Sequence, residues 1–184
     1  MSIAVKRIIK HIRLQINDFD EAKVSSFQIL NFLNRALAAI STAVETQHLN
    51  FLAKSQVYTG TSAVNGAVLP EDFQSVNEVV DGQEFTLSPA YVTKTPKAYE
   101  YKIMGEKIYC GADSYTLFYQ RFIPPVDTPE DTIEAPLYCL GLIVQTTIKL
   151  MQGMEAADQV KMIQNMVVSD IPADTYDKKR KREG

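Results

Sequence analysis

The sequence contains no tryptophan, only two cysteines and two histidines, and no long apolar run. Two cysteines, Cys110 and Cys139, set no disulfide framework, so we expect free thiols and synthesis in the cytosol. No stretch approaches the roughly 20 apolar residues of a membrane-spanning helix. The first residues, MSIAVKRIIKHIR, interleave charge with isoleucine, so we expect no signal peptide at this end.

The motifs of several enzyme classes are also absent. No GxxxxGKS/T or GxGxxG stretch occurs, so the sequence offers no glycine loop that could cradle a phosphate. His11 and His48 fall on separate predicted helices without metal-ligand spacing, and a Ser–His–acid triad would require one of them. We therefore expect no metal, no cofactor and no enzymatic activity. Both cysteines are expected to be small core residues rather than nucleophiles.

The formal net charge is only −3, but the charges are unevenly distributed. Residues 1–13 carry four bases and no acid, and residues 177–184 carry five bases and two acids. Subtracting +4 and +3 from −3 leaves −10 for residues 14–176. Basic blocks at the ends of an acidic body favour interaction with a partner, although a solvated tail that aids solubility has the same composition.

Apolar periodicity predicts two helices in the first 50 residues. Isoleucine and valine recur every three or four positions over residues 5–16, which indicates an amphipathic helix. A second helix is predicted to run to about residue 50 from Ser25 or Ser26, either of which can cap it. Its apolar stripe, which should face a partner helix, comprises Phe27, Leu30, Leu33, Leu37, Ile40 and Val44.

After residue 53 the pattern changes to short β-prone runs. Asp81 and Gly82 separate two such runs and predict a hairpin. Met104, Gly105 and Glu106 predict a second hairpin inside AYEYKIMGEKIYCG. SYTLFYQRFI, residues 114–123, is a third β run. These segments predict a small antiparallel sheet of about four or five strands.

Prolines mark the return to helix. IPPVDTPEDTIEAP, residues 123–136, is expected to be an irregular acidic connector, because each proline lacks an amide donor and restricts its predecessor. A third helix should begin near Pro136 and end at Gly153, and a fourth is expected at about 155–168. The stripe of the third helix comprises Leu137, Leu140, Val144, Ile148 and Met151.

The fold class predicted from this order is α+β, in a single domain of residues 1–184. Its main part is a bundle of about four helices, interrupted by a small antiparallel β insertion and followed by an extended C-terminal tail. The predicted segments are N-terminal helices at 1–52, a β insertion at 53–124, C-terminal helices at 125–170 and a basic tail at 171–184.

The stretch LPEDFQSV, residues 69–76, pairs two carboxylates, Glu71 and Asp72, and so raises the possibility of acid–base chemistry. Pro70 holds its predecessor extended, and acidic residues suit a turn whose side chains stay in water. Neighbouring acids on a turn also diverge, so they lack the shared geometry of a general acid–base pair. We interpret the stretch as a turn that leads into a strand, with Phe73 and Val76 entering the core.

Three segments resemble the head-to-tail connector, or adaptor, proteins of tailed bacteriophages. IRLQINDFDEAKVSSFQILNFLNRALAAIS is similar to their opening helices, and VLPEDFQSVNEVV to the loop and strand that follow in some of them. LFYQRFIPPVDTPEDTIEAPLYCLGLIVQTT is similar to a strand, a proline-rich connector and a helix opened by Ala-Pro, and residues 135–138 give the best single match. The order of elements also resembles the tail tubular A-type adaptors of short-tailed phages.

The resemblance implies a structural virion protein at the head–tail interface, assembled in the host cytoplasm. Such adaptors form a ring, usually of about twelve copies, that binds the portal protein, extends the DNA channel and gives the tail or nozzle protein a platform. DNA would pass through without specific binding. Within this picture, the portal or a neighbouring subunit would hold the basic tail, for which the family offers no recognised counterpart. The residues expected to bind there are Ile171, Tyr176, Lys178, Lys179, Arg180, Lys181 and Arg182.

Two other function classes are compatible with the residues. A small nucleic-acid-binding protein could use its basic ends, and it would show salt-sensitive DNA binding. A carboxylate-dependent hydrolase could use Glu71, Asp72 or the acids of residues 127–134, and it would need a concave pocket holding a carboxylate of perturbed pKa.

Overall fold

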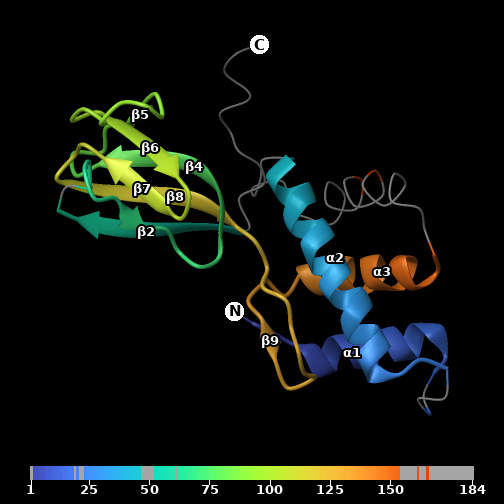
Figure 1. Ribbon diagram of the computed structural model, residues 1–184. Helices are drawn as coiled ribbons and strands as arrows, with labels where there is room; N and C mark the ends of the chain where they lie inside the picture. The colour runs from blue at the N-terminus through green and yellow to red at the C-terminus, as the bar shows by residue number, and fades with distance from the viewer. Residues whose placement is uncertain are drawn as a thin grey trace. The chain divides into compact units, whose positions relative to one another are not determined.

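A computed structural model describes residues 2–18, 20, 23–46, 52–60, 62–153, 161 and 165. The chain divides into two compact units (Figure 1). The helical unit comprises Met1–Leu52 and Phe122–Gly184, and the β unit comprises Ala53–Arg121. The β unit is thus inserted into the sequence of the helical unit, and each unit has its own apolar core.

The helical unit contains α1 (Val5–Ile16), α2 (Ser26–Thr46) and α3 (Cys139–Met151) (Figure 1). The predicted helix over residues 5–16 is confirmed. α3 packs against both other helices, and the core between them comprises buried aliphatic side chains that include Ile8, Ile12, Leu33, Leu37, Ile40, Leu142 and Val144. Each helix therefore buries its apolar face against the other helices, as the spacing of the apolar residues predicts.

The start of α2 follows the capping rules. The Ser25 side-chain hydroxyl accepts a hydrogen bond from the Gln28 amide at 3.2 Å, and the Gln28 side chain accepts one from the Ser25 amide at 3.0 Å. This reciprocal arrangement is a capping box, so the prediction of Ser25 as a cap is confirmed.

Two predicted members of the helical stripes are wrong. Phe27 is 72% exposed. Two steps of three residues separate it from the buried Leu33, and on a helix of 3.6 residues per turn they place the two side chains about 120° apart around the axis. Leu137 is also exposed, since it precedes α3 in a turn where the Cys139 amide donates to the Pro136 carbonyl at 3.0 Å. Gly153, two residues beyond α3, has a φ of 78° and terminates the helix as predicted.

The proline-rich connector is not wholly irregular, which corrects the prediction from its prolines. Its residues Thr132–Ile133 form β9, which pairs antiparallel with β1 (Ile3–Ala4). This strand lies in a proline-free interval between Pro129 and Pro136, where every residue keeps its amide donor. The connector also caps α1, because its carbonyls accept hydrogen bonds from two first-turn amides that have no partner within the helix.

Two polar side chains on α2 attach the connector to the helical unit. Asn34 donates to the Val126 carbonyl at 2.9 Å and accepts from the Val126 amide at 2.8 Å. Two helical turns further on, Ser41 accepts from the Ile123 amide at 2.9 Å. Together they satisfy three backbone groups in a segment whose residues 123 and 126 are buried.

The β unit contains two sheets that enclose one core. A three-stranded sheet has the order β2-β8-β4, and a four-stranded sheet has the order β3-β7-β6-β5. The strands are β2 (Ala53–Thr59), β3 (Ala67–Val68), β4 (Phe73–Asp81), β5 (Ser88–Pro89), β6 (Glu100–Met104), β7 (Lys107–Cys110) and β8 (Ser114–Arg121). The hairpin of β6 and β7 confirms the turn predicted at residues 104–106.

The predicted architecture, a mainly helical bundle with one small antiparallel sheet, is wrong. The described residues contain three helices and nine strands in three sheets, so the protein is a sheet-rich α+β fold. A single sheet could not bury the core of the β unit, because Tyr115, Leu117 and Tyr119 lie on one face of β8 and a second layer must cover that face. Ile108 and Cys110 of β7 lie in the same core. β5 pairs parallel to β6, so the strands are not all antiparallel as predicted. The fourth predicted helix, at 155–168, lies outside the described residues apart from Lys161 and Asn165.

Candidate interaction surfaces

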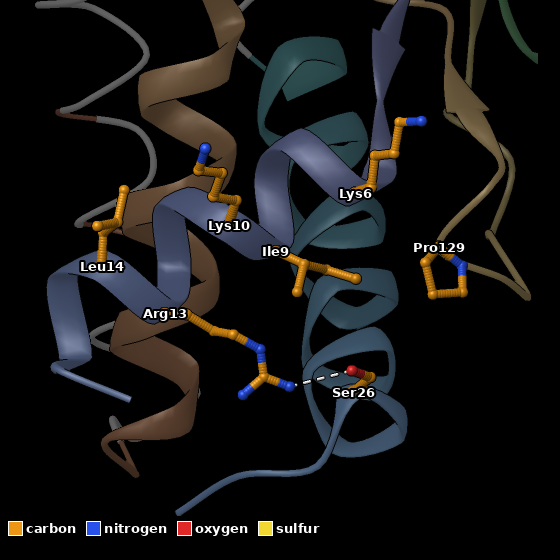
Figure 2. Close-up of a pocket in the computed structure, with 7 residues that line it drawn as sticks. All are labelled: Lys6, Ile9, Lys10, Arg13, Leu14, Ser26 and Pro129. Atoms are coloured by element: carbon orange, nitrogen blue, oxygen red, sulfur yellow. Dashed lines mark hydrogen bonds between the residues drawn. The ribbon is translucent and has the colours of Figure 1, made fainter. Parts of the chain in front are cut away.

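A groove of about 480 Å³ runs along one face of α1 (Figure 2). It is called the α1 groove here, and its lining comprises Lys6, Ile9, Lys10, Arg13, Leu14, Ser26 and Pro129. Positions 6, 9, 10, 13 and 14 fall on one helical face because they recur at intervals of three and four residues. Ser26 at the start of α2 and Pro129 of the connector lie opposite this face.

Arg13 is a fixed part of the α1 groove rather than a mobile cation. It is buried, and its guanidinium donates to Asp18 at 2.8 Å and to the Val24 carbonyl at 3.0 Å. Figure 2 shows its third hydrogen bond, to the Ser26 hydroxyl at 3.0 Å. A hydrogen bond from the Lys23 amide, with further help from Arg13, holds the pKa of Asp18 below its usual value of 3.8. This network joins the end of α1 to the start of α2.

Lys6 and Lys10 provide the exposed charge of the α1 groove. Both extend from α1 in Figure 2, one helical turn apart, and within the described part of the chain neither forms an ion pair. Ile9 and Leu14 contribute apolar surface between and beside them. A lining that combines exposed cations with apolar side chains is suited to a protein segment that carries both acidic and apolar side chains.

The two carboxylates of LPEDF lie in different environments. Glu71 is exposed, as predicted, but the prediction that Asp72 also stays in water is wrong. Asp72 is partly buried, accepts a hydrogen bond from the Tyr119 hydroxyl at 2.8 Å and pairs with Lys54 at 3.1 Å, with Arg121 4.0 Å away. Burial and this hydrogen bond raise the pKa of Tyr119. Asp72 therefore joins β2, β4 and β8, and the pair does not form an acid–base site.

A second concavity, of about 570 Å³, lies on the β unit beside this turn. Its lining comprises Val68, Leu69, Pro70, Glu71, Phe73, Gly105 and Glu106. Both glutamates are exposed, and Val68 is 68% exposed. Val68 belongs to β3, which is an edge strand of the four-stranded sheet. We call Val68, Glu71 and Glu106 the β3 patch. It combines an apolar side chain with two carboxylates, which no single sequence motif indicated.

Most of the large apolar side chains that are exposed in the described part of the chain belong to the β unit. Nine of the thirteen that are exposed lie between residues 53 and 121. Tyr91 is 78% exposed and Tyr99 is 67% exposed, and both belong to the loop that joins β5 to β6. Lys102 shapes this loop by donating to the carbonyls of residues 92 and 94 at 3.0 and 2.7 Å. Exposed aromatic residues on an ordered loop are typical of protein interfaces.

The remaining candidate residues from the sequence are the two cysteines, possible metal ligands and the residues of the basic tail. Cys110 and Cys139 are buried, as predicted, and burial raises the pKa of the Cys139 thiol to about 12. The residues described contain no group of three His, Cys, Asp or Glu side chains that could hold a metal ion. His48 and the predicted partner-binding residues of the tail, Ile171, Tyr176 and 178–182, lie outside the described residues.

Comparison with protein-family models and with curated proteins finds no match for this chain. Within the part of the chain that the structure describes, the helices lack the length and apolar character needed to cross a bilayer.

Proposed function

We propose that this protein is a ring-forming head-to-tail adaptor of a tailed phage, and that it works as a structural virion protein without catalysis. The proposal begins from the three segments that resemble this family. The observation that carries it furthest is the concentration of large exposed apolar side chains on the β unit, because aromatic side chains such as Tyr91 and Tyr99 are enriched at protein interfaces. The helical unit, with its well-formed core, would serve as the frame of the ring.

The proposal assigns a separate partner to each region. The β unit would meet a neighbouring subunit or the next tail component, through exposed residues such as Tyr91 and Tyr99. The tail would dock on the portal through Ile171, Tyr176 and the bases at 178–182. The net charge of −10 on residues 14–176 would favour passage of DNA through the ring, because like charges disfavour binding to the phosphates.

Native mass spectrometry and negative-stain imaging of the full chain, with and without the portal protein of the same phage, test the proposal directly. A closed ring of about twelve copies that assembles on the portal is the expected result. A chain that stays monomeric with portal at all salt concentrations would refute it. Salt-sensitive binding of DNA by the monomer would instead support a nucleic-acid-binding protein, whose cations would include the exposed Lys6, Arg7 and Lys10.

The role of the β unit is tested by a surface variant. Tyr91→Ser with Tyr99→Ser removes two exposed rings from the β5–β6 loop and should leave the melting temperature unchanged while tail attachment to filled heads is lost. The matched control replaces Thr93 and Thr95, polar exposed residues of the same loop, with alanine. Normal tailed particles from the tyrosine variant would show that this loop does not receive the tail.

The role of the tail is tested by truncation after Ile171. The body should fold with an unchanged melting temperature, while binding to portal weakens and depends less on salt, because the cations at 178–182 are lost. If the truncated chain binds portal as tightly as the full chain does, the tail is not the docking element.

A further inference from the structure

The α1 groove presents positive charge that α1 itself does not neutralise. Lys6 and Lys10 lie one turn apart on the groove margin, and α1 carries no acidic residue. Among the residues that the structure describes, no carboxylate forms an ion pair with either amine. Leu14, one turn beyond Lys10, offers exposed apolar surface, and the largely buried Ile9 lies between the two lysines; a bare phosphate backbone would leave this apolar surface unused. These features favour a protein segment with one apolar side chain and flanking acids.

The β3 patch has the complementary composition. Val68 projects from an edge strand, and Glu71 and Glu106 line the same concavity as Val68 does. Both glutamates belong to turns, so their side chains are carried by short segments at the margin of the β unit. One exposed valine with two carboxylates matches an apolar groove with two ammonium groups in both charge and polarity.

We propose that the α1 groove of one copy receives the β3 patch of the next copy around the ring. The inference rests on the proposed adaptor function. A closed ring of identical subunits requires head-to-tail contacts, in which two different patches of the chain face each other. The α1 groove and the β3 patch are such a pair, because they lie on different units and carry opposite charges. A second copy also supplies the acidic patch in the one-to-one ratio that a ring needs.

A charge-swap experiment tests this contact in the full chain. One variant carries Lys6→Glu and Lys10→Glu, and a second carries Glu71→Lys and Glu106→Lys. Each alone sets like charges against each other, so each should raise the concentration needed for ring assembly by more than about tenfold. The chain that carries all four substitutions restores opposite charges at every contact and should assemble as the wild type does. An equimolar mixture of the two variants should assemble at least in part.

Matched controls separate local contact from net charge. Arg7→Glu with Lys149→Glu changes the charge of the helical unit by the same amount at exposed positions that do not line the α1 groove, and it should leave assembly unchanged. Circular dichroism and melting curves of every variant show whether it folds. Rings from both two-residue variants at wild-type concentrations would overturn the inference, as would failure of the four-residue variant to recover when it is folded.

Cross-linking identifies the occupant of the α1 groove independently. Rings assembled on portal from equal amounts of ordinary and heavy-nitrogen-labelled chains are treated with a carbodiimide, which joins a lysine amine to a contacting carboxylate. Mixed-isotope peptides that link Lys6 or Lys10 to Glu71 or Glu106 are the expected result. Links from these lysines to the portal only, or within one chain only, would overturn the inference while the ring itself still supports the adaptor function. Failure of the wild-type chain to form any ring would count against the proposed function instead.

Discussion

Removal of the Asn34 side chain should release the connector from α2. Asn34 makes two hydrogen bonds to the backbone of Val126, one as donor at 2.9 Å and one as acceptor at 2.8 Å. Val126 is buried and Asn34 is partly buried, so water has limited access to these two bonds in the folded protein. The substitution Asn34→Ala deletes both bonds and leaves the amide and carbonyl of Val126 without these partners.

The expected cost follows from these two groups. Each hydrogen bond contributes about 0.5–1.5 kcal/mol net, and a buried backbone group left unsatisfied costs about 1–3 kcal/mol. Alanine is the better helix former and returns about 0.5 kcal/mol. We therefore expect Asn34→Ala to lower the free energy of unfolding by about 2–4 kcal/mol. Asn34→Asp keeps the acceptor for the Val126 amide but sets a carboxylate oxygen against the Val126 carbonyl, so it should also destabilise the protein.

Urea denaturation followed by far-ultraviolet circular dichroism measures this free energy, because the helices dominate the signal. The matched control is Asn31→Ala, on the same helix but exposed, which should change stability by less than about 0.5 kcal/mol. The difference between the two variants isolates the attachment of the connector. A difference below about 0.5 kcal/mol would show that the Asn34–Val126 bonds do not stabilise the fold.

Three further predictions concern other parts of the molecule. Leu37→Ala removes a fully buried side chain of the helical core and should cost about 2–5 kcal/mol in the same denaturation assay, and a loss below about 1 kcal/mol would contradict its core position. Because the pKa of Asp18 is lower in the folded than in the unfolded chain, its ionised form stabilises the protein above the usual value of 3.8 and this contribution is lost as the pH falls. Asp18→Asn should therefore be less stable than the wild type near neutral pH, and melts recorded at decreasing pH should show the gap closing; a gap independent of pH would contradict the assignment. Gly111→Ala should destabilise the β unit by about 1–3 kcal/mol, since its β-carbon would clash with the backbone carbonyl oxygen of Lys97, whereas Gly141→Ala meets no atom within 4 Å and should be neutral or stabilising. Equal melting temperatures for the two glycine variants would refute this close approach.

The sequence by itself determined the elements whose stability depends on near neighbours. The period of isoleucine and valine predicted α1 at Val5–Ile16, because an amphipathic helix needs only residues three and four positions apart. The serines at 25 and 26 predicted the start of α2 for the same reason, since a cap acts within one turn, and the structure adds Gln28 as the second member of a capping box. The turn between β6 and β7 was equally local, with Gly105 at a φ of 61°.

The sequence also indicated part of the candidate surfaces. The block of bases in residues 1–13 predicted a positive region, and two of its members, Lys6 and Lys10, line the α1 groove. The acidic turn at residues 71–72 was recognised as a turn, but its two carboxylates have different surroundings. Asp72 pairs with Tyr119, which is 47 residues away in the chain, and a local pattern carries no information about such a partner.

Only the tertiary structure decided how the β runs divide into two sheets and which residues form the α1 groove. Alternation along a strand shows which side chains share a face, but it does not show which layer covers that face. The cover for Tyr115 and Leu117 comes from the neighbouring sheet, and its choice depends on the volume and shape of the whole core. In the same way, Ser26 and Pro129 complete the α1 groove only because helix packing and the β1–β9 pairing bring distant segments together. Local periodicity records interactions within about one turn, whereas a groove or a sandwich exists only after the long-range contacts have been made.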